Sequence, residues 1–566
     1  MKKIAKIKLE KSDWLYNAGI VGICNILKYN ECDYDDSNIN YVEFESECLG
    51  NFEEKYFNYF IGTYEKFTSW YRLISFEDYM DNLDLNIISS KDLKYINKYI
   101  ENLKNKLKSN SYKSAYLVIN DKELDLVKKE KEIKKIKITK KQNINDVMVD
   151  IKKQIEIIKE IIEYLKRDEI KRYILAKNII YDVIQKFWEK VSFLNQKSNN
   201  KDMYEEFKRY FLDSTKTYLN SDKEKAKYYC FTCGRKVSSL KETFGLAWIN
   251  KIGVDMSRKS SHFWNMNGDA YICPICNLVY SCVPAGFTTL NGRGIFINEN
   301  SSIKNLIRIN KHSLDTTTSI DELEEESYFN IADSIGQVSI DKSERETENI
   351  QIIKLNSENE RRPYTFNIIS KEKLNIICKH RNMLKSMIKI HAKVGTNEYI
   401  NIYREVLDRI YKGKNLFDLI SKLSYLKLDG KFNGLQFIEM MLKINNNLLE
   451  RGEEIGMVSG SINDKAIYSF KCRGAELRKG YENRKALNKL GGVSYRLLNS
   501  LKTKNVSRFM DTIINSYMYL NMEIPTSFIN VLNDKNKFQT IGYAFLVGLQ
   551  GEEKFKKSGE EVNNDK

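Results

Sequence analysis

The chain has 566 residues, 42% hydrophobic and 30% charged, and this composition excludes wholesale disorder. Its length exceeds what one compact core accommodates, so we expect about two to four domains. Lys and Arg number 92 against 76 Asp and Glu, and the net charge of +16 favours a polyanionic partner, most often nucleic acid. Part of the lysine excess also fits the coding bias of an AT-rich bacterium, so charge alone does not decide the partner.

The sequence favours a cytoplasmic location with no membrane contact. No window reaches the ~18 consecutive apolar residues of a membrane span. The basic start at Lys2 and Lys3 is followed by Glu10 and Asp13 before any apolar run, so we expect no secretory signal. The cysteines outside the two pairs described below are scattered without a disulfide framework, which suits a reducing compartment.

The first predicted element is a helix over residues 13–28, entered at Ser12 or Asp13. Gly19 and Gly22 cost this helix stability, so we expect either another backbone or a ligand to approach it closely there, and packing against a backbone is the favoured explanation. Residues 31–60 are acidic and are predicted to face solvent or a basic partner protein. Residues 100–190 are lysine-rich and helical, with an exposed projection predicted around residues 128–141.

Two Cys-x-x-Cys pairs are the strongest motif in the chain, Cys230-Phe-Thr-Cys233 and Cys273-Pro-Ile-Cys276. Each pair places two thiolates on one side of a tight turn, and four sulfurs suit a tetrahedral structural zinc ion. His262 lies between the pairs and is an alternative ligand. A four-cysteine site has no open coordination position, so we expect the ion to act as scaffold and not as catalyst.

The segment after the second pair predicts short strands, at residues 278–280 and around a tight turn at Asn291-Gly-Arg-Gly294. The turn residues Asn291, Gly292, Arg293 and Gly294 would present backbone N–H groups and one guanidinium together, as phosphate or base-edge contacts require. An ordinary hairpin turn is the competing interpretation. Residues 313–362, rich in Ser, Thr and acidic side chains, are predicted to form a surface excursion.

The carboxy-terminal part is predicted to be a helical bundle. Its candidate helices lie near residues 435–450, 465–490, 493–502, 506–521 and 536–550. Residues 471–510 carry eleven basic side chains against two acidic ones. This imbalance predicts a surface that binds a nucleic-acid backbone without reading its sequence. The residues predicted to bind are Arg478, Lys479, Arg484, Lys485, Lys489, Arg496, Lys502, Lys504 and Arg508.

The spacing within this basic segment makes two further predictions. Lys471, Arg478 and Lys485 recur every seven residues and are predicted to share one helix face. Tyr481, Tyr495 and Phe509 are predicted to be available for stacking on bases.

Motifs of catalysis are missing from the sequence. It has no P-loop, no G-x-S-x-G turn, no H-E-x-x-H pair and no Asp-Asp doublet set on glycines. Its four histidines form no His-Asp pair. We therefore expect a protein that is not an enzyme.

Three features together resemble one protein family: Trp14-Leu15-Tyr16-Asn17-Ala18-Gly19 near the start, the paired Cys-x-x-Cys motifs, and Ile541-Gly-Tyr-Ala-Phe-Leu-Val-Gly-Leu549 closing a basic helical tail. This combination resembles the Cst family of CRISPR proteins, which are large subunits of the type I-B surveillance complex, Cascade. The resemblance covers most of the chain, apart from the acidic excursion.

The resemblance implies a non-catalytic subunit that recognises a protospacer-adjacent motif in duplex DNA, helps to open the duplex and holds the displaced strand. The implied partners are the crRNA-bound Cascade backbone, its small subunits and the helicase-nuclease that docks on the complex. Guide pairing would supply the sequence specificity of the assembly. Two alternatives stay open: a polymerase-like large subunit of a type III CRISPR complex, and a free-standing zinc-ribbon RNA-binding protein.

The expected fold class is α+β and predominantly helical. Residues 1–224 are predicted to form a mixed, helix-rich domain, and residues 225–300 a zinc-ribbon-like insertion with four cysteine ligands and short strands. Residues 301–430 would continue the first domain and carry the acidic excursion. Residues 431–566 would form a basic bundle like a Cascade small subunit.

Overall fold

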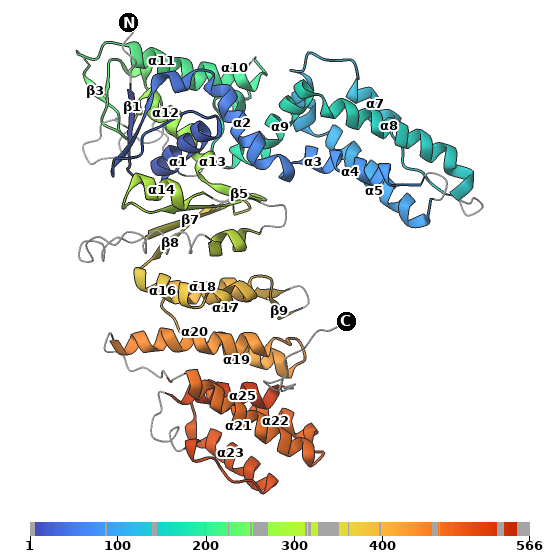
Figure 1. Ribbon diagram of the computed structural model, residues 1–566, viewed down its shortest axis with the longest axis vertical. Coiled ribbons are helices and arrows are strands. Elements are labelled where there is room, and N and C mark those ends of the chain that lie inside the picture. Colours follow the sequence, from blue (N-terminus) through green and yellow to red (C-terminus); the bar gives the residue numbers. More distant parts are fainter. Residues whose placement is uncertain are drawn as a thin grey trace, which may run out of the picture. The chain divides into compact units, whose positions relative to one another are not determined.

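The computed structural model describes residues 6–84, 88–138, 144–198, 200–224, 226–249, 252, 270–311, 314, 319–326, 350–359, 361–395, 398–454, 462, 464–528 and 537–551. These residues form two compact units (Figure 1). Unit 1 holds the described residues up to 326 together with 350–367, and unit 2 holds those from 368 onward. Helices dominate both units and the sheets are small and antiparallel, so the predicted fold class is confirmed. The predicted domain boundaries at residues 224, 300 and 430 stay predictions.

Unit 1 is built around helix α1 (Trp14–Tyr29), which follows strand β1 (Lys6–Glu10). The Asp13 carboxylate caps the helix by accepting hydrogen bonds from the backbone N–H groups of Leu15 and Tyr16. This confirms the helix start predicted from the sequence. Strand β1 pairs with β2 (Tyr41–Glu45) in a two-stranded antiparallel sheet.

The two glycines of α1 allow close contact with the segment after the second cysteine pair, as predicted. A Cβ atom on Gly19 would lie 2.5 Å from the carbonyl oxygen of Val279, and one on Gly22 would lie 1.9 Å from that of Cys282. Both distances are far below van der Waals contact, so only glycine fits here. Val279 belongs to α12 (Pro274–Ser281), and α13 (Val283–Gly286) follows directly.

Residues 278–280 therefore lie in a helix, and the prediction of a strand is wrong. Pro274 occupies the first turn of α12, where its missing N–H costs nothing. Every residue of this helix is buried, so its sequence does not alternate between apolar and polar residues with the period of a helix.

Other elements of this part of unit 1 include several helices and a four-stranded sheet. The sheet runs β5-β6-β7-β8 in space, and its first three strands pair antiparallel. The strands are β5 (Thr288–Leu290), β6 (Arg293–Asn298), β7 (Ile350–Asn356) and β8 (Tyr364–Ile369). The helices are α2 (Phe52–Tyr64), α9 (Asp168–Asp182), α10 (Met203–Phe207), α11 (Asp213–Asn220) and α14 (Ile303–Ile309).

Two acidic segments contribute to this core, against expectation. Strand β7 lies inside residues 313–362, and Ile352 and Ile353 are fully buried in it. A surface excursion is therefore wrong for this strand, while residues 327–349 lie outside the described residues. Helix α2 begins inside the acidic stretch 31–60 and buries Phe57 and Phe60 completely. Glu53 of this helix is buried as well, so an acidic composition did not mark an exposed segment.

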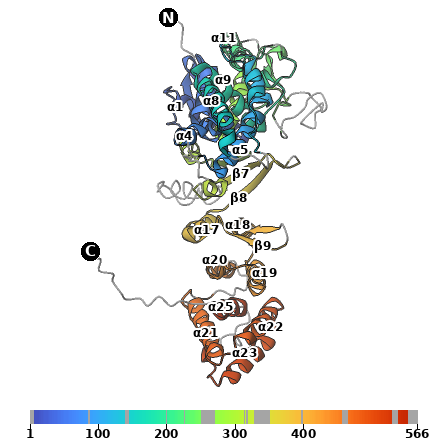
Figure 2. The ribbon, with the colours of Figure 1, turned by 90° about the vertical axis from the view of Figure 1, so that its right-hand side faces the viewer.

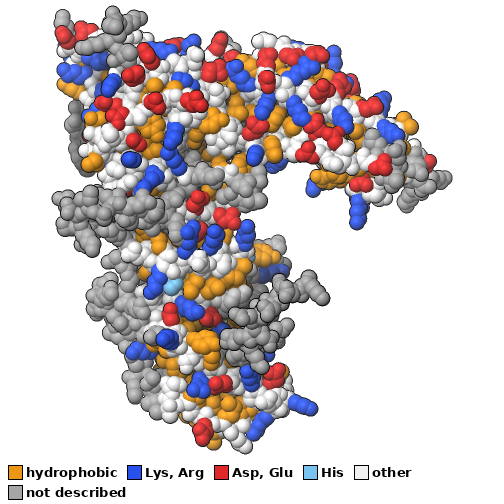
Figure 3. Space-filling model, viewed as in Figure 1, with side chains coloured by type: hydrophobic (Ala, Val, Ile, Leu, Met, Phe, Trp, Pro, Cys, Tyr) orange, Lys and Arg blue, Asp and Glu red, His pale blue; other side chains and the backbone are white. Residues whose placement is uncertain are grey.

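Unit 1 includes a helical arm with its own apolar core (Figure 1), which Figure 2 views from its end. Ile151, Ile155, Ile158 and Ile162 are buried along its longest helix, as their helical spacing predicted. Charged side chains of both signs are interspersed over its surface, the pattern of a solvated face (Figure 3). The arm comprises α3 (Ser69–Ile74), α4 (Phe76–Asp81), α5 (Ser90–Leu107), α6 (Asn110–Tyr116), α7 (Leu126–Glu132) and α8 (Met148–Lys166).

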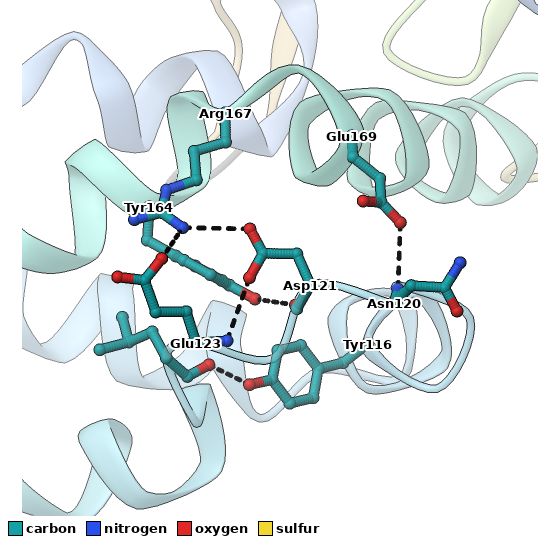
Figure 4. Close-up of polar contacts among 8 residues, drawn as sticks. Tyr116, Asn120, Asp121, Glu123, Tyr164, Arg167 and Glu169 are labelled. Atoms are coloured by element: carbon teal, nitrogen blue, oxygen red, sulfur yellow. Dashed lines mark hydrogen bonds and ion pairs between the residues drawn. The ribbon is translucent and has the colours of Figure 1, made fainter.

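Polar contacts fix the connection between α6 and α7 to the junction of α8 and α9 (Figure 4). Arg167 forms ion pairs with Asp121, at 3.0 Å, and with Glu123. The hydroxyl of Tyr164 donates a hydrogen bond to the backbone oxygen of Asp121 at 2.7 Å. Glu169 accepts one from the backbone N–H of Asn120 at 3.0 Å.

The predicted projection around residues 128–141 packs against the arm in its described part, although most of its lysines are exposed as expected. Ile133 is completely buried, and Glu130 is 7% exposed. The Glu130 carboxylate forms ion pairs with Lys104 at 3.3 Å and Lys108 at 3.1 Å. The lysines that suggested a projection therefore accompany a packed segment.

Unit 2 consists mainly of helices, with one two-stranded sheet of β9 (His391–Lys393) and β10 (Tyr399–Asn401). Helices α21 and α25 approach closely, since a Cβ atom on Gly474 would lie 2.0 Å from the oxygen of Phe545. The five helices predicted from the sequence are all present, although α21 ends seven residues early. The helices are α16 (Lys371–Lys379), α17 (Arg381–Met387), α18 (Ile402–Tyr411), α19 (Phe417–Leu428), α20 (Leu435–Glu454), α21 (Asp464–Asn483), α22 (Leu490–Lys502), α23 (Val506–Leu520) and α25 (Phe538–Gln550).

Candidate metal centre and basic surface

The first cysteine pair lies on a short hairpin of β3 (Tyr228–Tyr229) and β4 (Lys236–Val237). The N–H of Gly234 donates to the backbone oxygen of Cys230 at 2.9 Å, and the N–H of Cys230 donates to that of Arg235 at 2.8 Å. Gly234 has a φ of 66°, which glycine adopts without strain. This turn brings the sulfurs of Cys230 and Cys233 to one side.

The second pair lies at the start of α12. Cys273 is the residue that precedes the first turn, and Cys276 lies within that turn. Backbone hydrogen bonds join the two pairs, because the N–H of Phe231 donates to the oxygen of Tyr271 at 3.0 Å. The N–H of Cys273 also donates to the sulfur of Cys230 at 3.2 Å, a contact that stabilises a thiolate.

The four sulfurs have the spacing of a tetrahedral metal site. The Sγ atoms of Cys230 and Cys276 are 3.7 Å apart, as are those of Cys233 and Cys273. All four lie within 4.8 Å of one another. Ligands about 2.3 Å from a central zinc ion would be separated by about 3.8 Å in a regular tetrahedron. The four residues therefore fit a tetrahedral metal ion. His262, the alternative ligand, lies outside the described residues.

The surroundings favour negative charge at Cys233, one of the four sulfurs. Hydrogen bonds from neighbouring thiols, Cys230 first, lower the pKa of the Cys233 thiol well below its usual range. The Arg235 guanidinium lies beside this sulfur and partly offsets the charge of four thiolates. Arg235 also donates a hydrogen bond to the backbone oxygen of Lys8, which ties the hairpin to β1.

The metal centre belongs to the main core of unit 1. Cys273 and Cys276 are completely buried among the apolar residues of that core. The sulfur of Cys276 lies 3.6 Å from the hydroxyl oxygen of Tyr16 on α1. Tyr16 stands in the Trp14–Gly19 segment that the sequence singled out, so the structure joins two separate sequence features in one place.

The turn at residues 291–294 has hairpin geometry. Asn291 and Gly292 have positive φ values of 49° and 73°, as in a two-residue turn between antiparallel strands. Gly294 and Arg293 already belong to β6, where they pair with Leu355 and Asn356. Asn291 and Gly292 line a pocket of about 330 Å³ that Arg72 and Lys186 also border. These contacts support the hairpin interpretation, and a recognition role stays a prediction.

The predicted nucleic-acid-binding residues lie on the surface of unit 2. Arg478 is half-buried, and the other eight are exposed: Lys479, Arg484, Lys485, Lys489, Arg496, Lys502, Lys504 and Arg508. The predicted common helix face is wrong, because α21 ends at Asn483 and Lys485 follows with a φ of 55°. Lys471 forms an ion pair with Glu439 at 3.1 Å. The exposed cations instead come from α21, α22, α23 and the turns between them.

Of the three aromatic residues predicted to stack on bases, only Tyr495 is exposed. Phe509 is fully buried and Tyr481 is 3% exposed, so both pack in the core and stacking on bases is wrong for them. Tyr495 is 58% exposed and remains available. The sequence reasoning missed Tyr519, whose hydroxyl oxygen accepts a hydrogen bond from the Lys489 ammonium at 3.1 Å. The Arg484 guanidinium lies 5.5 Å from the same ring.

Residues 223–288 match the model of a family described as CRISPR-associated protein (Cas_CXXC_CXXC). The match covers both cysteine pairs and supports a CRISPR-associated protein with a role in CRISPR defence. Neither curated proteins nor solved structures give a match to the chain. Within the described part of the chain, no helix combines the length and the apolar character that crossing a membrane requires.

Proposed function

We propose that this chain is the non-catalytic large subunit of a type I-B CRISPR Cascade complex. In this role it contributes to recognition of the protospacer-adjacent motif, opening of the duplex, holding of the displaced strand and docking of the helicase-nuclease. The family match over residues 223–288 is the observation that carries the proposal. The cytoplasm, where crRNA and invading DNA meet, is the corresponding location.

In this proposal the metal centre has a structural role and the basic surface of unit 2 binds DNA. The four sulfurs hold a structural zinc ion that fixes the hairpin of the first cysteine pair against α12. The exposed cations of unit 2 neutralise phosphates of the strand, and Tyr495 stacks on an unpaired base. Guide pairing, and not this surface, supplies sequence specificity.

The experiment compares charge reversal on this surface with charge reversal elsewhere. The variant R496E/K504E/R508E changes three exposed side chains of unit 2, and the control K94E/K152E/K153E changes three exposed side chains of the arm. Both alter the net charge equally. We expect only the first to weaken DNA retention by the purified chain and to lower the slope of log K against log salt by about 2.

The role in Cascade is tested by assembling the complex with and without this chain. We expect target DNA to be bound stably and cut only when the chain is present. Equal binding in both assemblies would contradict the proposal. Formation of cyclic oligoadenylates from ATP by the chain would point instead to the type III alternative.

A further inference from the structure

A second feature of unit 1, apart from the metal centre, is a pocket of about 260 Å³ between α1, α2, α13 and the end of α14. Two lysines, Lys28 and Lys311, line this pocket. They come from positions far apart in the chain, Lys28 from the last turn of α1 and Lys311 from the residues after α14. No carboxylate lines the pocket among the residues that the structure describes.

The two ammonium groups lie close enough to affect each other. Burial lowers the pKa of Lys311, and the neighbouring Lys28 ammonium lowers it further. Asp36 lies near enough to oppose this effect without cancelling it. A protein gains nothing in stability by bringing two cations together, so an anion between them would relieve a real cost.

Four aromatic side chains line the pocket, among them Tyr29 and Tyr59. The rings of Tyr29 and Tyr59 meet edge to face with their centroids 5.9 Å apart. The Tyr59 hydroxyl and the Asn25 amide both donate hydrogen bonds to the backbone oxygen of Ala285, at 3.2 and 3.0 Å. These contacts hold the rings in place before any ligand binds, which lowers the entropy cost of binding.

We propose that this pocket binds a phosphate-bearing ligand, with the phosphate between Lys28 and Lys311 and an attached nucleoside against the rings of Tyr29 and Tyr59. Lysine ammonium groups recognise phosphate as point charges, and tyrosine rings offer flat apolar surface to a base. The ligand is a free nucleotide or the phosphorylated end of a strand, which share this chemistry. The site lies apart from the cations of unit 2, so the proposal goes beyond the function proposed above.

The test is calorimetric titration of the full chain with AMP, inorganic phosphate and adenosine. We expect AMP to bind more tightly than phosphate, and adenosine not to bind measurably. The variant K28Q/K311Q should weaken AMP binding by about tenfold or more, because two charge-assisted contacts are lost. The control K152Q/K153Q removes two exposed lysines of α8 and should bind AMP as the unaltered chain does.

Competition identifies the source of the phosphate. Displacement of AMP by a 5′-phosphorylated oligonucleotide, but not by its 5′-hydroxyl form, would support the end of a strand. Displacement by neither would support a free nucleotide. Thermal melting checks that K28Q/K311Q is folded. The proposal is overturned if millimolar AMP does not bind the unaltered chain, or if folded K28Q/K311Q binds it equally well.

Discussion

Replacing Cys233 by serine tests the metal centre with little disturbance of the core. Cys233 is half-buried, whereas the other three cysteines of the site are buried. Serine keeps the size of the side chain but removes one of four soft ligands. We expect about one zinc ion per chain in the unaltered protein, and a large loss of metal from Cys233→Ser after dialysis against a chelator.

The effect on stability follows from the loop that the metal closes. Cys233 and Cys273 are 40 positions apart in the chain. Cross-linking a loop of this length restricts the unfolded chain by about 4 kcal/mol, taking the disulfide relation as a guide. At roughly 2–4 °C per kcal/mol for a sizeable domain, unit 1 should melt about 10 °C lower without the metal.

Two measurements check this reasoning together, metal content by mass spectrometry and unfolding by differential scanning calorimetry. The control is Cys472→Ser, a half-buried cysteine of α21 outside the metal site. It should leave both the metal content and the melting of unit 1 unchanged. The reasoning fails if Cys233→Ser retains its metal, or if it loses the metal and melts at the same temperature as the unaltered protein.

Three further predictions concern burial, helix packing and stacking. Burial lowers the pKa of Lys177 to about 8, so stability should rise between about pH 8 and 10.5 as this lysine loses its proton in the folded state first. Lys177→Met should abolish this rise in the free energy of unfolding, measured in urea, and should stabilise unit 1 by up to about 3 kcal/mol at pH 7. A variant with the same pH dependence as the unaltered chain would contradict this assignment to Lys177. Gly22→Ala should destabilise unit 1 by about 3 kcal/mol, because the added Cβ would lie 1.9 Å from a backbone oxygen. The control is Gly491→Ala, whose Cβ would have no atom within 4 Å and which should not destabilise α22. Similar shifts in melting temperature for the two variants would refute the packing argument. Tyr495→Leu should weaken single-stranded DNA binding by about 1 kcal/mol in fluorescence titration, and unaltered affinity would show that no base stacks there.

Local signals in the sequence predicted several features correctly because their causes are local. The start of α1 depends on one carboxylate two and three residues from the N–H groups that it caps, a relation visible in any short segment. Five helices of unit 2, namely α20, α21, α22, α23 and α25, were predicted from local sequence in the same way. The Cys-x-x-Cys spacing predicted a turn with two sulfurs on one side, and the four sulfurs meet as expected.

Predictions from the sequence failed for two reasons. Where a helix is buried on all sides, its apolar residues show no helical period, and where a segment is rich in charged residues, those residues need not all be exposed. Helix α12 reads as a strand because every one of its residues is buried. Glu130 lies in a lysine-rich stretch that suggested a projection, yet it forms ion pairs with Lys104 and Lys108. In both cases the neighbours that decide the outcome lie elsewhere in the chain.

The order of residues was enough to predict the mainly helical fold class, the cap and glycine notch of α1, and the set of four sulfurs. Three arrangements became visible only in the folded chain. Tyr16 contacts Cys276, Tyr519 contacts both Lys489 and Arg484, and Lys28 and Lys311 line the same pocket. The physical reason is the distance along the chain over which each kind of interaction acts. Propensities, caps and turns act over a few residues, whereas contacts between distant residues form only after the core has closed and fixed which surfaces face each other.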